Sequence, residues 1–274
     1  MKRKLIYALI PIILLIIIVL IGLIISTIKN QTKEDNKKVF KVEDRTKNIE
    51  SNQKYNNDFY EINAWIKVQG TNIDVPVISY IKQNKIKIEV KIDNYAWQSD
   101  YHKEVINKET IIGHNILNLS QHPGYGIDYY KSFEDLMGFV YLDFAKENQY
   151  VQYTIDGKNY VYKIFSVFFD DTAEMINDQY EKNISKKSLK KIINRYKKAS
   201  IYKYDVDVNE NDKIITLDTC TRFFGNNDYK TFTVHARMLR EGEKTDNYKV
   251  EKTDNYKKIE KKLIEKGEEE NEEI

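Results

Sequence analysis

An uncharged run near the start of the chain constrains its folding more than any other feature. Residues 5–28 are 24 successive positions without a charged side chain, and most of them are isoleucine, leucine or valine. In a helix that rises about 1.5 Å per residue, this run would reach roughly 36 Å, which is enough to cross a hydrocarbon core of about 30 Å. The sequence therefore predicts one transmembrane helix at residues 5–28.

Three basic residues precede this run and indicate its orientation. Lys2, Arg3 and Lys4 place residues 1–4 in the cytoplasm by the positive-inside rule. A cleaved signal peptide is the alternative, but its apolar region would span about 7–15 residues and end in a small-residue cleavage site. No such site follows Ile28. We expect an uncleaved signal anchor in the cell membrane, a single-pass topology, and the rest of the chain outside the cell.

The composition suits a folded domain and excludes several classes of protein. Hydrophobic residues make up 41% of the 274 positions, which is enough for a core in one or two domains. With 10 Gly, 3 Pro and 1 Cys, the chain is neither collagen-like nor low-complexity nor a disulfide framework. Its net charge of +2 lacks the basic excess of nucleic-acid-binding domains, so we expect no nucleic acid as a partner.

Patterns of short strands fill the middle of the chain. Residues 29–60 are polar and predict a stalk or an N-terminal helix, whereas residues 61–240 form the expected folded unit. Asp156 and Gly157 predict a hairpin turn between two strands. Apolar or alternating runs typical of strands occur at residues 64–68, 74–80, 86–92, 137–144, 150–155, 160–169, 213–219 and 231–239. The unit is therefore expected to be mainly β.

Two further segments favour helices. Behind Ser185, a suitable N-cap, residues 185–200 place four apolar side chains at helical spacing: Leu189, Ile192, Ile193 and Tyr196. We expect a surface helix that covers the sheet, and the alternative is a basic face near an anionic wall polymer or lipid head groups. Residues 241–274 are expected to be a charged tail, solvated or frayed, in which EKTDNYK occurs twice.

The single cysteine, Cys220, has no partner for an internal disulfide. A buried small hydrophobe, an intermolecular crosslink or lipidation site, and a reactive thiol are the three explanations that remain. Cys220 ends the apolar run at residues 213–219 and precedes a polar loop. A side chain at such a strand exit is held by the sheet and still reaches the surface, which suits a nucleophile.

A thiol nucleophile needs a partner that helps it to ionise, because the thiolate is the reactive species. His114 follows a short apolar strand that ends in Gly113, so it also lies at a strand exit. The other histidines are expected at the surface (His102), in a turn (His122) and within a sheet (His235). Cys220 and His114 are therefore the candidate pair.

Two motifs around this pair resemble the sortases, membrane-anchored cysteine transpeptidases of Gram-positive bacteria. Residues 216–220, TLDTC, resemble the TLxTC signature of that family, and residues 112–115, IGHN, resemble its histidine segment. The order of the motifs agrees, and residues 65–77 resemble the family's opening strands. The resemblance covers about 60–240. It implies a closed, eight-stranded, sortase-type β-barrel with peripheral helices, preceded here by the transmembrane helix.

Within the family, the chain is most similar to class B, whose members carry N-terminal helices and a helix between the sixth and seventh strands. Residues 77–114 depart from that class, because they are shorter or rearranged. The family also has an arginine before the apolar run of its last strand, where this chain has Lys230 and, at the usual arginine position, Thr231. Lysine lacks the forked donors of a guanidinium group. Arg222 and Arg237 are the possible substitutes, and we favour Arg222 because it shares the loop of Cys220.

The resemblance implies a reaction and its partners. Cys220, as a thiolate, attacks a peptide carbonyl in the C-terminal sorting signal of a secreted protein, and His114, as an imidazolium, protonates the leaving amine. Arg222 or backbone N–H groups stabilise the oxyanion, and an amine of a peptidoglycan precursor then resolves the thioester. No cofactor or metal is expected, since no His or Cys cluster has ligand spacing. Class B suggests a sorting motif similar to NPxTN instead of LPxTG.

Two other functions stay open on the sequence alone. A membrane-tethered cysteine hydrolase of wall peptides would use Cys220 and His114 with water as the acceptor. A catalytically silent surface scaffold protein would agree with the missing arginine, and its Cys220 would be unreactive.

Overall fold

The computed structural model describes residues 40–81, 92, 94–98, 108–112, 133–171, 185–221, 223–225 and 230–272. These residues belong to one compact unit, Phe40–Ile274, which is separate from Met1–Val39. The predicted transmembrane helix at 5–28 lies outside the described residues. Within the described ranges, no helix is long and apolar enough to cross a membrane.

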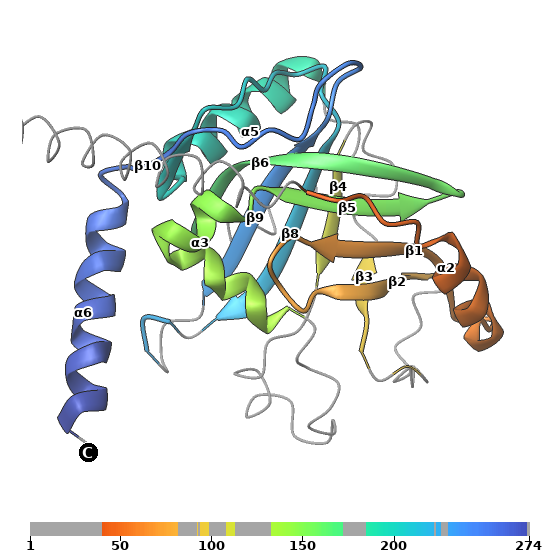
Figure 1. Ribbon diagram of the computed structural model, residues 1–274, viewed down its shortest axis with the longest axis horizontal. Coiled ribbons are helices and arrows are strands. Elements are labelled where there is room, and N and C mark those ends of the chain that lie inside the picture. The colour runs from red at the N-terminus through yellow and green to blue at the C-terminus, as the bar shows by residue number, and fades with distance from the viewer. Residues whose placement is uncertain are drawn as a thin grey trace, which may run out of the picture. The chain divides into compact units, whose positions relative to one another are not determined.

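Eight strands form a closed barrel, which confirms the fold predicted from the sequence (Figure 1). Around the barrel their order is β1-β2-β3-β4-β8-β9-β6-β5, and only the β2–β3 and β4–β8 pairs are parallel. A separate two-stranded sheet pairs β7 with β10. The barrel strands are β1 (Tyr60–Val68), β2 (Asp74–Tyr80), β3 (Ala96–Gln98), β4 (Lys108–Ile112), β5 (Tyr150–Ile155), β6 (Lys158–Asp171), β8 (Ile214–Thr221) and β9 (Lys230–Met238). The small sheet consists of β7 (Tyr202–Tyr204) and β10 (Val250–Lys252).

The hairpin between β5 and β6 forms where it was predicted. Asp156 and Gly157 both have positive φ angles, 52° and 68°, as a tight turn between twisted antiparallel strands requires. Most of the predicted strands are confirmed, although the predicted strand at 86–92 lies outside the described residues except for Ile92.

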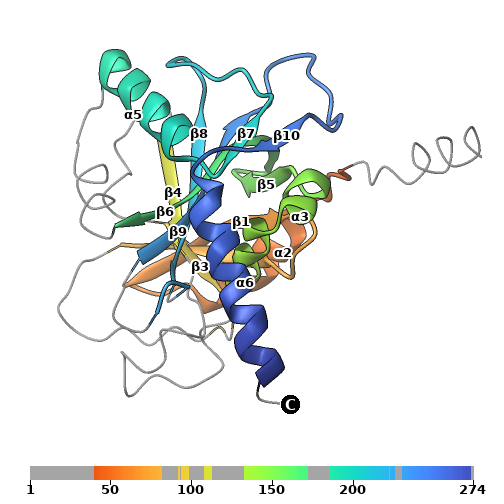
Figure 2. The same cartoon turned by 90° about the vertical axis from the view of Figure 1, so that its left-hand side faces the viewer.

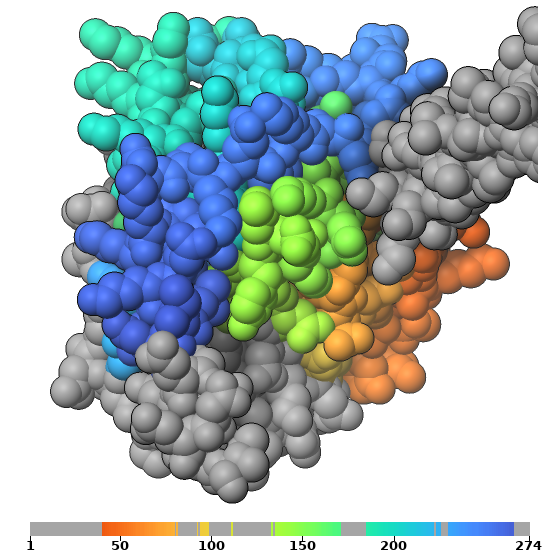
Figure 3. Space-filling view, turned by 60° about the vertical axis from the view of Figure 1, so that its left-hand side comes forward, coloured from red at the N-terminus to blue at the C-terminus, as the bar shows by residue number. Residues whose placement is uncertain are grey.

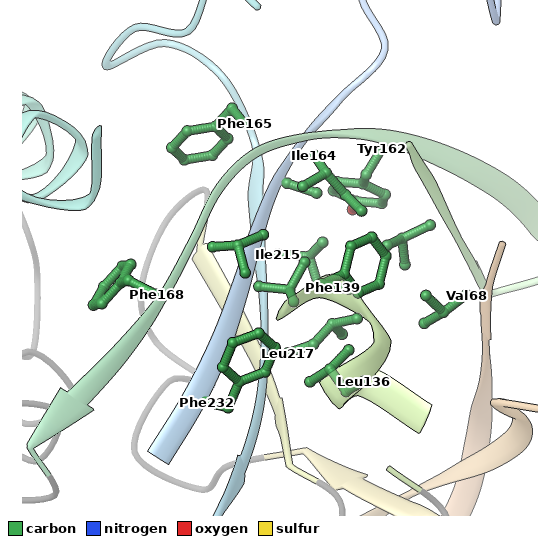
Figure 4. Packing of buried hydrophobic residues seen from close by; sticks show 14 of the residues in the cluster. Val68, Leu136, Phe139, Tyr162, Ile164, Phe165, Phe168, Ile215, Leu217 and Phe232 are labelled. Atoms are coloured by element: carbon green, nitrogen blue, oxygen red, sulfur yellow. The ribbon is translucent and has the colours of Figure 1, made fainter. Parts of the chain in front are cut away.

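One predicted strand is wrong. Residues 137–144 belong instead to the 3-10 helix η5 (Glu134–Val140) and the short helix α3 (Leu142–Glu147). The buried residues of this segment, Leu136, Phe139 and Val140, follow the i, i+3, i+4 spacing of a helix, which a short apolar run does not distinguish from a strand. Figure 4 shows Leu136 and Phe139 packed among side chains of the barrel strands, with Leu217 and Phe232 close by.

The predicted surface helix is confirmed as α5 (Lys186–Ala199), and it lies between β6 and β7 in the chain, as class B implies. Ser185 caps it, because its side chain accepts a hydrogen bond from the Ser188 backbone N–H. The four predicted apolar residues are buried. The helix itself packs against β6 on the outside of the barrel (Figures 1 and 2). Six lysines remain exposed on its other side: Lys186, Lys187, Lys190, Lys191, Lys197 and Lys198.

The polar stretch before the barrel is, from Phe40 onward, attached to it. Short helices occur there, α2 (Thr46–Asn52) and η1 (Gln53–Tyr55). The Phe40 ring stacks on the Tyr150 ring at 5.5 Å, and the Arg45 guanidinium forms an ion pair with Asp74 of β2. An N-terminal helix therefore describes these residues better than a free stalk does.

The segment after the barrel is not simply a solvated tail. The Tyr248 hydroxyl donates to the carbonyl oxygens of Gln149 and Ile164 at 2.7 Å, and Val250 of β10 is buried. Helix α6 (Tyr256–Glu272) then buries Tyr256 and Ile259. In the space-filling view this blue segment lies against the green residues of η5 and α3 (Figure 3).

The repeated heptapeptide EKTDNYK explains why the charged composition of residues 241–274 wrongly predicted a solvated tail. Its first copy carries Tyr248 and its second carries Tyr256, and each tyrosine contacts the body of the domain. The neighbouring lysines and acids, among them Lys249 and Glu251, are exposed. A few apolar anchors in a charged sequence are therefore sufficient to dock the segment.

We expect deletion of residues 241–274 to lower the free energy of unfolding by about 3 kcal/mol or more. Each fully buried apolar side chain contributes about 1.5–3 kcal/mol, and the deletion also leaves the buried Arg237 without Glu243. Deletion of residues 268–274 is the control and should leave stability unchanged. Urea unfolding followed by circular dichroism measures both, and equal midpoints for the two deletions would contradict the docking of this segment.

Candidate active site

Strand β8, paired on both sides up to Asp218, holds Cys220 opposite Thr231 of β9 while the side chain of Cys220 remains exposed. β8 pairs in parallel with β4 and antiparallel with β9, and from Ile214 to Thr221 every residue is buried except Cys220. Cys220 therefore lies inside the strand, one residue before its end, and not in the following loop. Its exposure excludes the explanation that it is a buried small hydrophobe.

The side chains that share the outer face of β8 with Cys220 form a polar strip across three strands. Each of them stands opposite one residue of β9: Cys220 faces Thr231, Asp218 faces Thr233, and Thr216 faces His235. On β6, Asp170, Phe168 and Ser166 follow in the same order. Residues directly opposite in an antiparallel pair have Cβ atoms about 4.5–5.5 Å apart. Thr231, at the position where the resembled family has arginine, is thus the cross-strand neighbour of Cys220.

Arg237 is too far from Cys220 to replace the missing arginine. It pairs with Ile214, at the other end of β8, so six residues or about 20 Å of strand separate it from Cys220. Arg237 is buried, forms an ion pair with Glu243 and donates from Nε to the Asp207 carbonyl oxygen at 2.7 Å. The hydrogen bonds from Arg237 lower the pKa of Glu243 to about 2, which marks this pair as structural.

Two of the predicted site residues, His114 and Arg222, lie outside the described residues. The structure describes β4 up to Ile112 and β8 up to Thr221, and each predicted residue follows closely in the chain. Their roles therefore stay predictions.

His235 is a satisfied sheet histidine, as predicted. Its ring stacks on Tyr196 of α5 with centroids 3.7 Å apart, and its two ring nitrogens lie 3.0 Å from Thr216 Oγ1 and 3.1 Å from Thr233 Oγ1. Nearby, Asp170 of β6 forms an ion pair with Arg195 of α5 at 3.5 Å. Helix α5 thus contacts the polar strip at His235 and at Asp170, while Cys220, at the end of the strip, stays exposed.

Asp218 is the residue of this site that the sequence did not single out. Its carboxyl is buried two positions before Cys220, and Oδ1 has no hydrogen-bond partner among the described residues. Burial raises the pKa of Asp218 to about 8; the hydrogen bond with the Thr231 hydroxyl opposes this rise, and the charge of Asp170 adds to it. Asp218 is therefore mostly protonated and neutral at pH 7. The signal in the sequence was an acidic residue at a buried position of an otherwise apolar strand.

No metal-binding group is found in the part of the chain that the structure describes. Three or more His, Cys, Asp or Glu side chains do not converge anywhere within it. The chemistry available at the described site is that of a thiol, a neutral carboxyl group and hydroxyl groups.

We expect Asp218→Asn to stabilise the fold increasingly as pH rises. Folding raises the pKa of Asp218 above its usual 3.8, so its stabilising contribution is full below about pH 4 and is lost as pH rises through about 8. The gain in the variant should therefore grow between those values, by at most about 1.4 kcal/mol per pH unit. Urea unfolding at pH 5, 6, 7 and 8 measures it. Asn in place of the exposed Asp58 is the control, and identical pH dependence in the two variants would show that Asp218 is not buried as a neutral acid.

Comparison with known proteins gives one consistent result. No protein-family model matches the chain. Sortase B of Staphylococcus aureus is 24% identical over 202 residues, which cover 70% of this chain and 75% of that protein. Sortase B of Listeria monocytogenes is 25% identical over 177 residues, and the match spans 61% of this chain and 65% of that protein.

Solved structures of the same kind share the fold. Sortase B of Clostridium perfringens matches with a TM-score of 0.54 and 26% identity, covering 70% of this chain and 99% of that one. A crystal structure of Staphylococcus aureus sortase B matches with a TM-score of 0.52 and 20% identity, over 70% of this chain and 86% of that one. Together with the closed barrel and the exposed cysteine one residue before the end of β8, these matches show that the chain is similar to the sortases, most of all to class B, and they support a cysteine transpeptidase of that type.

Proposed function

We propose that the chain cleaves a C-terminal sorting signal of secreted proteins through a thioester at Cys220 and joins them to an amine of the cell wall. The observation that carries this proposal is the position of Cys220. It is the chain's single cysteine, it is exposed, and it lies in a strand of a sortase-type barrel that pairs with β4 up to Asp218 and with β9 through Cys220 itself. A nucleophile needs this combination of rigid support and access to substrate.

The register of β4 supports His114 as the partner of Cys220. In this parallel pair Ile112 stands beside Asp218, and His114 and Cys220 each follow two residues later. A pairing that continued in the same register would bring the imidazole next to the thiol. His114 then favours the thiolate by its positive charge and protonates the amine that leaves the peptide bond.

The oxyanion formed at the attacked carbonyl also needs hydrogen-bond donors. Thr231 occupies the usual arginine position, so we assign the positive charge to Arg222, two residues after Cys220. Backbone N–H groups of the same loop are the other donors. Such groups act by being fixed where negative charge develops in the transition state.

The sequence supports a location at the outer face of the cell membrane. The uncharged residues 5–28 are long enough to span the bilayer, and the basic residues before them favour a cytoplasmic N-terminus. An anchor there would hold the barrel at the surface where exported proteins and peptidoglycan precursors pass. The sorting motif would be similar to NPxTN, as the likeness to class B suggests.

Trapping the acyl-enzyme tests this function. Residues 30–274 are incubated with a library of sorting peptides and an amine acceptor, and the intact protein and products are weighed by mass spectrometry. We expect an acyl mass on the wild type, none on Cys220→Ala, and a product joined to the amine. Hydrolysed peptide in the presence of excess amine would favour the wall-peptide hydrolase. An unmodified Cys220 with every peptide would favour the silent scaffold.

We expect Arg222→Ala to lower kcat/KM for transpeptidation by about 10²–10³-fold with the fold intact, the usual cost of losing an oxyanion donor. Arg240→Ala is the control. The Arg240 side chain forms ion pairs with Asp207 and Asp212 beyond the opposite end of β8 and should have no direct role in the chemistry. If transpeptidation by Arg222→Ala matched that of the wild type, the role assigned to Arg222 would be wrong.

A further inference from the structure

Two residues close to Cys220 have no role in the site expected from the sequence. Thr231 stands opposite Cys220, where the family resemblance predicts an arginine, and Asp218 places a carboxyl on the same face of β8 two residues before Cys220. Asp218 and Thr231 are diagonal neighbours across the β8–β9 pair, which puts the carboxyl and the hydroxyl within reach of a hydrogen bond. A buried acid thus lies beside the place where a charged donor is missing.

The surroundings of Asp218 favour its neutral form. Thr233 of β9 stands opposite it, and Ile112, its neighbour on β4, does not titrate. Among the described residues, the other titratable or charged groups of this region are Asp170 of β6, Arg195 of α5, His235 of β9 and Cys220 of β8 itself. His114 and Arg222, which the proposed function assigns to the same site, lie outside the described residues. Arg195 is paired with Asp170, and His235 is held by two threonine hydroxyls. Among the described residues, no cation forms a hydrogen bond or an ion pair with Asp218.

A neutral carboxyl group can donate a hydrogen bond that a carboxylate cannot. If the Asp218 O–H donates to Thr231 Oγ1, the hydrogen of the Thr231 hydroxyl is available in another direction. Its other acceptor within the described residues is the Asp170 carbonyl oxygen at 3.4 Å, which is a long contact. On the opposite side, the Cys220 side chain is only one cross-strand spacing away.

We propose that Asp218 positions the Thr231 hydroxyl so that its one hydrogen points toward Cys220, where it is donated first to the sulfur and then, once acyl transfer begins, to the substrate oxygen that becomes negative beside it. This inference rests on the proposed function and deepens it, since Thr231 then serves as a donor at the place of the missing arginine. No proton is transferred in this arrangement. Asp218 keeps its proton and acts only through Thr231, as a positioning residue.

Ionisation of Asp218 would reverse the arrangement. A carboxylate accepts the Thr231 hydrogen and turns it away from Cys220, and it also adds a buried negative charge near the thiolate. Both effects oppose catalysis. Acyl transfer should therefore decline at alkaline pH as Asp218 loses its proton, in addition to any decline caused by His114.

Isosteric variants separate this role from a merely structural one. Asp218→Asn keeps an N–H donor but does not ionise, whereas Thr231→Val keeps the shape but loses the hydroxyl. Thr231→Ser keeps the hydroxyl and is the conservative control. The rate of acyl-enzyme formation at Cys220 is measured by intact mass from pH 6 to pH 10, with an active sorting peptide at saturation and circular dichroism at every pH.

We expect Thr231→Val to react at least tenfold more slowly than the wild type at pH 7 with little change in KM, and Thr231→Ser to recover most of the rate. Asp218→Asn should react severalfold faster than the wild type at pH 9, and its rate should lack the part of the alkaline decline that the ionisation of Asp218 causes. Overlapping pH profiles for Asp218→Asn and the wild type, or a wild-type rate in Thr231→Val, would overturn the inference and leave the proposed function standing. Absence of any acyl-enzyme in the wild type would overturn both.

If Asp218→Asn does not fold, Asp218→Ser supplies a second variant with a donor that does not ionise in this pH range. Its profile is compared with that of the wild type in the same way. Retention of the wild-type alkaline decline in a folded Asp218→Ser would likewise overturn the inference.

Discussion

The position of β8 between β4 and β9 is the constraint on which the rest of the site depends. A strand paired on both sides cannot slip by one residue without turning all of its side chains to the other face. The interior face of β8 is fixed by Leu217 and Ile215 in the barrel core, so Cys220 must face outward. The barrel core thus determines where the thiol lies, and closure of the barrel brings β4 and β9 to either side of it.

The same face of the sheet also sets the electrostatics of the thiol. Helix α5 covers the strip from His235 to Asp170 and removes it from water, while Cys220 remains accessible. Burial raises the pKa of Asp218, and Thr231 stands opposite the cysteine on β9. Hydrogen bonds of neutral groups would then supply part of the polarity that an arginine supplies elsewhere in the family. A neutral donor forms a weaker hydrogen bond than a guanidinium group does. Stabilisation of the oxyanion would therefore depend more on the exact placement of the donor than it does in a site with an arginine.

Much of this fold could be predicted from the sequence, because its signals are local. Apolar or alternating runs predicted most of the strands, Asp156-Gly157 predicted a hairpin, and the apolar stripe from Leu189 to Tyr196 predicted α5. What failed depended on tertiary contacts. Residues 137–144 form helical turns because Leu136 and Phe139 fill the barrel, and Tyr248 and Tyr256 dock a segment whose composition is that of a solvated tail. Asp218 was not singled out from the sequence, because the motif does not show its burial. Its position opposite β9 was not visible in the motif either.

The central proposal is that the β4–β8 pairing would continue in register beyond Ile112 and bring position 114 beside Cys220, and a disulfide tests it most directly. Because Cys220 is the only cysteine, a His114→Cys variant has one possible intramolecular bridge, which requires Cα atoms about 4.4–6.8 Å apart. Mild oxidation followed by alkylation and intact-mass analysis measures it, with Asn115→Cys as the neighbour that should face away. The account predicts rapid loss of both thiols in His114→Cys monomers and slow loss in Asn115→Cys. Two free thiols in oxidised His114→Cys, or bridging only between chains, would contradict it.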